Sequence, residues 1–327
     1  MLTGGLGNQL FQFKAALSFS SNDSLILEST LGAPSLNRGG KPEIFSFDLP
    51  SAQLFPPKKR RNRIVSSLLA VQLRDAKAAR YKFIVKILQW LAQSFSSLAL
   101  SLYFHKWFKV ISSGQIGFDK SIKYYDGNRF LVGYFQSFKW NNENVMTKLK
   151  ELKLTENSVL VNEYKDLAKV ERPLVVHLRL GDYKSENNFG ILSPEYYESA
   201  ITELLAKGIY RKVWIFSDEP ELAARILPLS ITSHARWIPE LEGSVAKTFE
   251  VMRHGHGYVI GNSTFSWWAA FISHKDSPIV IAPDPWFMNL STPQDLIPPH
   301  WQLKPALFLN KSQILQFSHG KPLESGS

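Results

Sequence analysis

The chain has 327 residues, of which 44% are apolar, 20% are charged and none is cysteine. This composition excludes a mainly disordered, collagen-like or coiled-coil chain, and the lack of thiols excludes disulfides, cysteine-ligated zinc, iron–sulfur clusters and cysteine nucleophiles. The formal net charge of +10 favours polyanionic partners, such as nucleic acid, anionic lipid or phosphorylated ligands, without choosing among them. The length predicts about two domains.

The chain opens with a glycine-rich stretch, residues 4–9, which predicts a loop before a helix over 10–20 and a strand over 25–27. A βαβ unit has a strand before such a loop, but only Met1-Leu2-Thr3 precedes it here. We therefore expect that strand to be nearly absent or to lie upstream of the recorded start. The first residues also lack the basic region and apolar run of a signal peptide.

Residues 56–113 combine a basic cluster at 58–63 with helical sequence that includes an uncharged stretch at 87–104. That stretch approaches the length that spans a bilayer, but its glutamines and serines disfavour a spanning helix. An ordinary amphipathic or core helix is the favoured interpretation. A helix lying in the plane of an anionic membrane beside the basic cluster remains the alternative.

Short apolar runs alternate with helical patterns in the second half of the chain. The predicted strands are 173–179, 213–216, 236–238, 258–260 and 279–282, and the predicted helices are 194–208, a helix from 220, 244–254 and 264–273. This alternation is typical of a doubly wound α/β domain. The polar sequence after Asn310 predicts a frayed tail.

Residues 177–183, His-Leu-Arg-Leu-Gly-Asp-Tyr, form the richest stretch. Strand alternation places His177 and Arg179 on one face, with Arg179 near the carboxyl end of the strand, where open α/β sheets bind ligands. A guanidinium there can hold a pyrophosphate, and Gly181 allows the backbone to approach closely. The alternative is an arginine paired with an acidic neighbour such as Asp182.

Residues 261–268, Gly-Asn-Ser-Thr-Phe-Ser-Trp-Trp, follow a predicted strand and open a helix. The free N–H groups of a helix N-terminus bind anions, and the hydroxyls of Ser263, Thr264 and Ser266 add donors. The alternative is a well-capped helix whose two tryptophans lie in the core.

Other signals are weaker. Gly5 and Gly7 nearly match the dinucleotide-binding pattern G-x-G-x-x-G, but Leu10 occupies its last position. The alternative is a loop that brings Asn8 and Gln9 to a ligand. Asp218, after a strand, either binds a ribose or base or caps the next helix.

A metal site is not expected, because the sequence contains no Asp-x-Asp. His254 and His256 lie at a predicted helix end, where a cation is ordinary.

Four blocks in this order resemble the α-1,2-fucosyltransferases of glycosyltransferase family eleven. They are residues 4–12 (GGLGNQLFQ), 133–137 (GYFQS), 177–183 (HLRLGDY) and 261–268 (GNSTFSWW). The resemblance implies an α/β fold of GT-B type, with two Rossmann-like domains and a cleft between them. We assign residues 1–155 to an acceptor-side domain with a helical insertion around 60–112, residues 156–310 to the donor domain, and residues 311–327 to a tail.

The same resemblance implies an inverting, metal-independent transfer of L-fucose from GDP-fucose to the 2-hydroxyl of a galactoside, in the synthesis of surface glycan or O-antigen. No cofactor is implied beyond the donor substrate. The expected cellular location is the cytoplasm, and peripheral contact with the inner membrane is left open.

Carried over by position, the resemblance places Arg179 at the donor pyrophosphate, His177 in support and Asn8 near the reacting centre. The full set of donor-binding candidates is His177, Arg179, Asp218, Ser263, Thr264, Phe265, Ser266, Gly5 and Gly7. Asp182 is the candidate base, a task that the leaving phosphate could share. Leu180 departs from the family, which often has a second arginine there.

Two alternatives remain open at this point. One is a transferase that uses another nucleotide sugar or acceptor. The other is a polyanion-binding protein, suggested by the net charge, but the sequence shows no RNP, helix-turn-helix or zinc-finger pattern.

Overall fold

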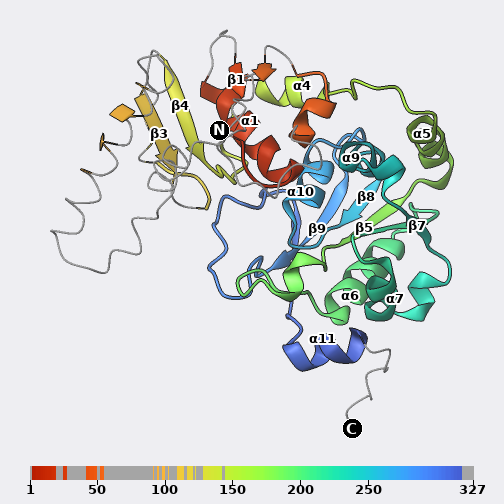
Figure 1. The fold of residues 1–327 in the computed structure, drawn as a ribbon. Coiled ribbons are helices and arrows are strands. Elements are labelled where there is room, and N and C mark those ends of the chain that lie inside the picture. The colour runs from red at the N-terminus through yellow and green to blue at the C-terminus, as the bar shows by residue number, and fades with distance from the viewer. Residues whose placement is uncertain are drawn as a thin grey trace. The chain divides into compact units, whose positions relative to one another are not determined.

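The computed structural model describes residues 2–19, 25–27, 42–49, 52–54, 91, 94–95, 98–99, 102, 109–113, 116–120, 122, 128–141 and 144–318 (Figure 1). The chain divides into two compact units. Unit 1 comprises Met1–Lys153 together with Pro293–Leu296, and unit 2 comprises Leu154–Thr292 together with Ile297–Ser327. The chain therefore enters unit 1 twice.

Unit 2 is built on a six-stranded sheet in which every strand runs parallel to its neighbours. In chain order the strands are β5 (Leu174–Leu178), β6 (Val213–Ser217), β7 (Arg236–Ile238), β8 (Gly257–Val259), β9 (Ile279–Asp284) and β10 (Gln302–Pro305). Their order across the sheet is β10-β9-β8-β5-β6-β7. The chain thus winds outward from β5 through β6 to β7 and then restarts beside β5 at β8, which is the doubly wound order of α/β proteins. The predicted α/β class is confirmed, whereas β10 was not predicted.

Helices cover both faces of this sheet (Figure 1). They are α5 (Val159–Glu171), α6 (Pro194–Leu205), α7 (Pro220–Ile226), α8 (Leu229–Thr232), α9 (Val245–Met252), α10 (Thr264–Phe271) and α11 (Lys311–Ser318). Helices α5 and α10 both pack on α9 on one face, and α6 packs on β5, β8 and β10 on the other. All five residues of β5 are buried, as expected for a central strand covered on both faces.

The last described helix corrects the prediction of a frayed tail after Asn310. Residues 311–318 form α11, whose Phe317 is buried in the main core of unit 2. The guanidinium of Arg225 in α7 donates to the carbonyls of Phe317 and Ser318 at 2.9 and 2.8 Å. Two apolar residues, Ile314 and Phe317, and a cation at the helix C-terminus anchor this mainly polar segment.

Unit 1 contains helix α1 and two pairs of parallel strands. Its elements are α1 (Leu6–Phe19), β1 (Leu25–Leu27) paired with β2 (Ala52–Leu54), a short 3-10 helix η2 (Glu43–Ser46), β3 (Lys109–Ser113) paired with β4 (Arg129–Gly133), and α4 (Val145–Lys150). Around Trp140 pack the rings of Phe19, Phe118 and Phe135. The strand predicted at 25–27 is confirmed.

Helix α1 starts at Leu6, four residues earlier than predicted. Gly7, Asn8 and Gln9 therefore belong to its first turn and not to a loop. The first N–H groups of a helix have no partner within it, so a glycine there loses less than it would in the middle. Residues 2–5, which precede α1, form no strand.

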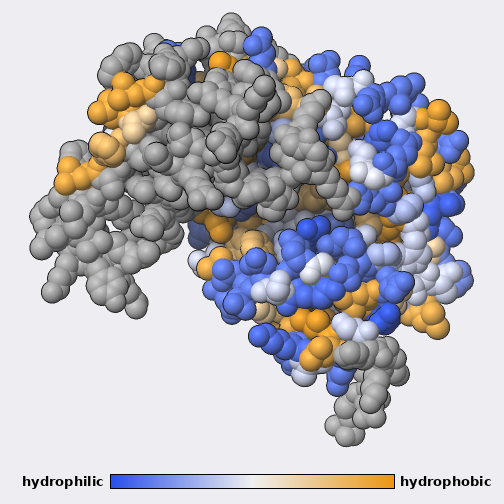
Figure 2. Space-filling model, in the orientation of Figure 1, coloured by the Kyte–Doolittle hydropathy of each residue, from blue (hydrophilic) through white to orange (hydrophobic). Residues whose placement is uncertain are grey.

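Much of the predicted insertion at 60–112, and the whole basic cluster at 58–63, lies outside the described residues. Residues 91, 94, 95, 98, 99 and 102 are helical. Among the helices that the structure describes, none has the length and apolar character needed to cross a membrane. The visible surface of unit 2 is mainly hydrophilic with scattered apolar side chains, an ordinary pattern for a globular domain (Figure 2).

Candidate functional site

The carboxyl ends of β5 and β6 bring Arg179 and Asp218 together. These strands are hydrogen-bonded neighbours, and each residue follows the end of its strand by one position. The guanidinium of Arg179 lies 3.1 Å from a carboxylate oxygen of Asp218, and its Nε donates to Asp182 at 2.8 Å. Arg179 therefore pairs with the predicted neighbour and also with a carboxylate that sequence spacing did not connect to it.

Asp218 does not cap the next helix, which corrects one of the two expectations for it. Glu219 occupies the cap position of α7. The two carboxylate oxygens of Asp218 accept hydrogen bonds from the backbone N–H groups of Leu180 and Gly181, at 2.9 and 3.1 Å. A Cβ at position 181 would lie 2.8 Å from the Asp218 carboxylate, so this turn accommodates only glycine without a shift. Asp218 thus fixes the backbone on which Arg179 stands.

The charges around Arg179 keep it protonated. Burial works to lower the pKa of Arg179, but its hydrogen bond to Asp182 and the charge of Asp218 outweigh burial and raise it. The side chain is 38% exposed, so the guanidinium remains accessible to a ligand. Asp182 and Asp218 both contact Arg179, so their oxygens orient a cationic side chain.

His177 lies in β5 behind this group. Burial lowers the pKa of His177 to about 4, and the charge of Arg179 acts in the same direction, while that of Asp218 opposes it. The imidazole is therefore neutral at neutral pH. Its ring centroid lies 5.8 Å from that of Phe265, and its buried Nδ1 has no hydrogen-bond partner among the described residues. A buried polar atom without a partner is uncommon, and a ligand or an ordered water can supply the missing hydrogen bond.

The segment between β8 and α10 carries the second group of predicted residues. Ser263 is the N-cap of α10, and its hydroxyl accepts the N–H of Phe265 at 3.3 Å. The Ser266 hydroxyl donates to the Ser263 carbonyl at 3.3 Å and is fully buried. Ser263 therefore caps the helix, as the alternative interpretation expected, and the Ser266 hydroxyl is satisfied by the backbone of the same turn. Thr264 is half-buried at the start of the helix. Trp267 and Trp268 are fully buried, as predicted.

These two groups meet at one point of the sheet. Strands β5 and β8 are adjacent, and the direction of winding reverses between them, which is where open α/β sheets bind their ligands. A Cβ at Gly261 would lie 3.0 Å from the carbonyl oxygen of His177. The hydroxyl of Tyr183 donates to the carbonyl of Asn262 at 3.1 Å. The structure thus joins residues 177–183 and 261–268 into one surface of unit 2.

Tyr183 and Asn262 are residues of this site that sequence reasoning did not single out. The Asn262 amide donates to the carbonyl of Phe189 at 2.9 Å, and the rings of Tyr183 and Phe189 stack with centroids 5.0 Å apart. Both residues lie inside the quoted motifs, so the signal was present. Tyr183 and Asn262 are 79 residues apart along the chain, and Asn262 and Phe189 are 73 apart, so spacing alone cannot pair them.

Unit 1 brings together the other two predicted blocks. The Asn8 side-chain oxygen accepts a hydrogen bond from the Gln136 amide at 2.8 Å. The amide of Gln12 donates to the carbonyl of Gly133 at 3.0 Å, and the oxygen of Gln9 accepts the N–H of Ile44 at 3.0 Å. Gln136 is thus a further candidate residue, because it contacts the one side chain of unit 1 that the resemblance places near the reacting centre.

Gly5 and Gly7 differ in their surroundings within unit 1. Gly5 is exposed and a Cβ there would meet nothing within 4 Å, whereas Gly7 is buried in α1. Gly5 thus retains the open backbone that a ligand contact requires, and Gly7 contributes to the packing of the helix.

A buried lysine and a buried aspartate hold the loop that carries Gln136. The Lys14 ammonium donates to the carbonyls of Ser137 and Phe138 at 3.3 and 2.7 Å, and burial lowers the pKa of Lys14 to about 7. A carboxylate oxygen of Asp295 accepts from the N–H of Phe118 at 2.5 Å and from the hydroxyl of Ser137 at 3.0 Å. Asp295 reaches this loop from the segment Pro293–Leu296, where the chain re-enters unit 1.

Comparisons with known proteins place this chain among glycosyltransferases. A model of the family described as "Glycosyl transferase family 11" matches residues 99–302. An "Alpha-1,2-colitosyltransferase" of Escherichia coli is 30% identical over 159 residues, which cover 45% of this chain and 54%, about half, of that protein's length. The Escherichia coli "O-antigen biosynthesis glycosyltransferase WbnK" is 24% identical over 310 residues, which cover 88% of this chain and 93% of the relative.

Two solved structures are more distant. NodZ α-1,6-fucosyltransferase soaked with GDP-fucose is 12% identical, with 90% of this chain and 97% of that chain covered and a TM-score of 0.44. POFUT1 in complex with GDP-fucose is 14% identical, with 85% and 95% covered and a TM-score of 0.46.

Proposed function

The chain belongs to glycosyltransferase family 11, and from that premise we propose that it transfers L-fucose from GDP-fucose to the 2-hydroxyl of a galactoside, with inversion and without a metal ion. The observation that carries the proposal is the junction of β5 and β8, where Arg179 and the start of α10 share one surface. In surface glycan or O-antigen synthesis, such a transfer would build the galactoside 2-fucosyl linkage.

The proposed donor site stabilises the leaving group. Breaking the bond between fucose and the β-phosphate leaves negative charge on GDP while the sugar becomes oxocarbenium-like. The guanidinium of Arg179 and the free N–H groups at the start of α10 are fixed donors that can receive this charge as it develops. Arg179 would exchange the carboxylate of Asp182 for a phosphate oxygen. Neutral His177 and Phe265 would form the wall behind it.

The acceptor hydroxyl attacks the sugar carbon as the bond to phosphate breaks, and its proton must move to a base. Asp182 is the candidate, and its side chain is 57% exposed. Asp182 is hydrogen-bonded to Arg179 at 2.8 Å, so we expect its carboxylate to reach the acceptor proton only after the phosphate has taken its place at Arg179. Asn8 and Gln136 of unit 1 are the candidates for orienting the acceptor.

The decisive experiment compares two arginines of unit 2 that have the same exposure. Arg236, like Arg179, is 38% exposed and pairs with a carboxylate, that of Glu171 at 2.5 Å. We expect Arg179→Ala to abolish fucosyl transfer, a loss of at least about 100-fold in kcat, because a fixed donor to developing charge is removed. Arg236→Ala should retain transfer.

Both variants are assayed with GDP-fucose and a panel of β-galactosides, with the product linkage read by NMR. Circular dichroism and thermal melts confirm that each variant is folded. Normal transfer by Arg179→Ala would reject the proposed role, and an equal loss in both variants would show that the loss is not specific to the donor site.

A different donor sugar is the second candidate, because one relative is named a colitosyltransferase. Thermal-shift measurements with GDP-fucose, GDP-mannose, UDP-sugars and the nucleotide donor of colitose separate the possibilities. Stabilisation by GDP-fucose and not by UDP-sugars supports the first proposal. Stabilisation by a UDP-sugar alone would contradict it.

Peripheral contact with an anionic membrane is a further part of the proposal. Leu91, Phe95, Leu98 and Leu102 are each helical and 47–68% exposed. In the helix that the sequence predicts at 87–104, their spacing would place them on one side. Such an exposed apolar stripe is typical of a helix that lies in a membrane interface. The double variant Phe95→Glu/Leu98→Glu should stop the protein from floating with anionic vesicles, whereas Leu229→Glu on unit 2 should not. A wild-type protein that never floats at low salt would contradict this.

A further inference from the structure

A compact group of titratable side chains lies away from the proposed donor site. Glu250 is in the last turn of α9, His254 follows that helix, and His274 follows α10. Both helices end just before the parallel strands β8 and β9 begin, so these residues lie at the amino-terminal end of the sheet. Arg179 and Asp218 follow the carboxyl ends of β5 and β6, at the opposite end.

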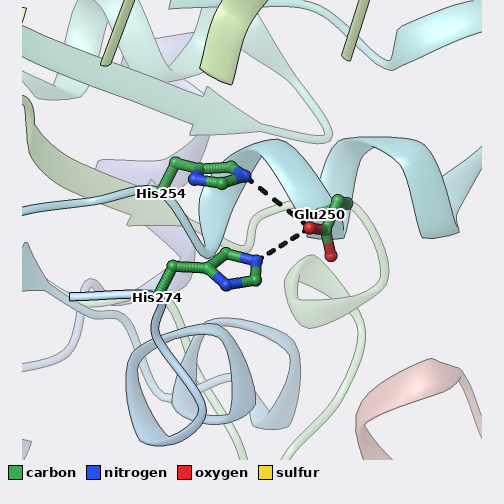
Figure 3. Close-up of side chains that lie close together, drawn as sticks. All are labelled: Glu250, His254 and His274. Atoms are coloured by element: carbon green, nitrogen blue, oxygen red, sulfur yellow. Dashed lines mark hydrogen bonds and ion pairs between the residues drawn. The ribbon is translucent and has the colours of Figure 1, made fainter. Parts of the chain in front are cut away.

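The three side chains converge on one small volume (Figure 3). One carboxylate oxygen of Glu250 lies 2.8 Å from Nε2 of His274 and 3.6 Å from Nε2 of His254. The two imidazole rings are stacked with centroids 4.3 Å apart and an angle of 20° between their planes. One nitrogen from each ring and one carboxylate oxygen all lie within 4.8 Å of one another.

An ion pair between Glu250 and one histidine does not explain this arrangement. At 2.8 Å the contact to His274 is a hydrogen bond, but at 3.6 Å the second imidazole is too far for one. Both Nε2 atoms nevertheless point at the same oxygen (Figure 3). A cation held among the three atoms would be bound by all of them.

The other oxygen of Glu250 is held from behind. The guanidinium of Arg253 is fully buried, donates to that oxygen at 2.7 Å and donates from Nε to the carbonyl of Ile272 at 3.1 Å. The carbonyl of Arg253 accepts the N–H of His274 at 3.0 Å and the hydroxyl of Tyr258 at 3.1 Å. These bonds fix the carboxylate and tie the backbone before β8 to the backbone before β9. Outer partners of this kind orient the ligands in known metal sites.

We propose that Glu250, His254 and His274 form a binding site for a divalent transition-metal cation, with Zn²⁺ as the best match. Two imidazoles and one carboxylate are a known three-ligand set for Zn²⁺, which leaves a fourth position for water. In a tetrahedral site with bonds of about 2.1 Å, the ligand atoms lie roughly 3.4 Å apart. The 2.8 Å contact between Glu250 and His274 would have to open by about 0.6 Å around the ion, whereas the 3.6 Å distance between Glu250 and His254 already matches this spacing.

The protonation states also suit a metal. Burial works to raise the pKa of Glu250, but the nearby imidazoles of His254 and His274 and the charge of Arg253 hold it well below its usual range, so the carboxylate is ionised. Burial lowers the pKa of His274, so its ring is neutral at neutral pH. Its one proton lies on Nε2, which donates to Glu250, and this proton would shift to Nδ1 when a metal takes the Nε2 lone pair. The positive charge of Arg253 beside Glu250 opposes a second cation. The site should therefore bind Zn²⁺ more weakly than a structural zinc centre does.

The first measurement uses the full-length chain without a histidine tag, freed of metal by a chelator that is then removed. Titration with ZnCl₂ in a calorimeter should show one saturable site per chain, and zinc should raise the thermal midpoint. Co²⁺ at the same site should give the strong visible absorption of a tetrahedral complex. A chain that shows no saturable Zn²⁺ binding overturns the proposal.

Variants locate the site. His254→Asn and His274→Asn should each weaken Zn²⁺ binding by at least about tenfold. The matched control is His256→Asn, two residues from His254 and outside the cluster, which should bind as the wild type does. Unchanged binding in His254→Asn, or an equal loss in His256→Asn, would overturn the proposal. Should the histidine variants misfold, a zinc anomalous peak in wild-type crystals decides: a peak at Glu250 supports the site, and a peak elsewhere refutes it.

Discussion

In unit 2, Arg179, Asp218 and Ser263 all follow the carboxyl ends of buried parallel strands, so the sheet itself brings them to one place. In unit 1, by contrast, Asn8 is reached by Gln136 from a loop that Lys14 and Asp295 hold with buried polar bonds. The difference teaches where a site is vulnerable. When strands position a site, the backbone can keep its place after one side chain is removed. When buried polar groups position a site, removing one of them also releases the backbone that it holds.

Among the substitutions that test this comparison, Asp295→Ala should cause the largest loss of stability. It leaves the N–H of Phe118 and the hydroxyl of Ser137 without their shared acceptor inside unit 1. We expect a loss of about 3 kcal/mol in the free energy of unfolding, because two bonds to a charged group are removed. Urea unfolding measures it. Asp166→Ala, at an exposed ion pair with Lys169, should cause no measurable change. Equal stability of both variants would show that Asp295 does not support the loop.

The pH dependence of stability tests Lys14. The pKa of Lys14 is 10.5 in the unfolded chain and about 7 in the folded one, so between these values the unfolded chain binds more protons. Folding is therefore favoured as pH rises through this range, by about 2 kcal/mol between pH 7 and pH 9. Lys14→Met should abolish that increase, as followed by urea unfolding at each pH. Lys169→Met, an exposed control, should keep it, and an unchanged slope in Lys14→Met would contradict the assignment.

Gln136→Ala tests whether unit 1 acts on the acceptor while unit 2 binds the donor. It removes the hydrogen bond to Asn8, worth about 1 kcal/mol, so we expect kcat/KM for the acceptor to fall about fivefold. Affinity for GDP, measured by calorimetry, should not change. Tyr134→Phe is the control in the same loop and should leave both quantities intact. A loss of GDP affinity in Gln136→Ala would place Gln136 on the donor side instead.

The smallest expected changes in stability come from substitutions at two helix caps of unit 2. The hydroxyls of Ser158 and Ser263 cap α5 and α10 by accepting backbone N–H groups. Ser158→Ala and Ser263→Ala should each lower the free energy of unfolding by about 1 kcal/mol. GDP affinity should fall, by a few fold, in Ser263→Ala alone. If both variants bind GDP equally well, the start of α10 does not contact the phosphates.

The sequence predicted the parts of the fold that depend on local pattern. The apolar run around Val176 and the turn signals between the later runs were sufficient for five of the six strands of unit 2. Helix α11 was missed because only two of its residues, Ile314 and Phe317, pack on the core of unit 2, while most of its other residues are polar. The early start of α1 was missed because Gly7 and Asn8 suggest a loop, while the tertiary bonds of Gln9 that hold this turn are invisible in the sequence.

The candidate site was predictable by residue type but not by partner. Arg179 stood out as a cation at a strand end, and Asp182 as its neighbour. The contact of Arg179 with Asp218, and of Asp218 with Leu180, depends on which strands lie side by side, and that order is a property of the whole sheet. His254 also seemed ordinary in the sequence. His274 comes close to it only because α9 and α10, which these histidines follow, pack side by side.

The return of the chain to unit 1 at Pro293–Leu296 has a consequence for biosynthesis. When residue 153 leaves the ribosome, the loop at 135–139 still lacks the carboxylate of Asp295. At about 5–20 residues per second, translation takes roughly 7–28 s to reach that aspartate. Unit 1 can therefore complete its fold only after most of unit 2 has been synthesised. A fragment that stops at residue 153 should be incompletely folded and should bind chaperones.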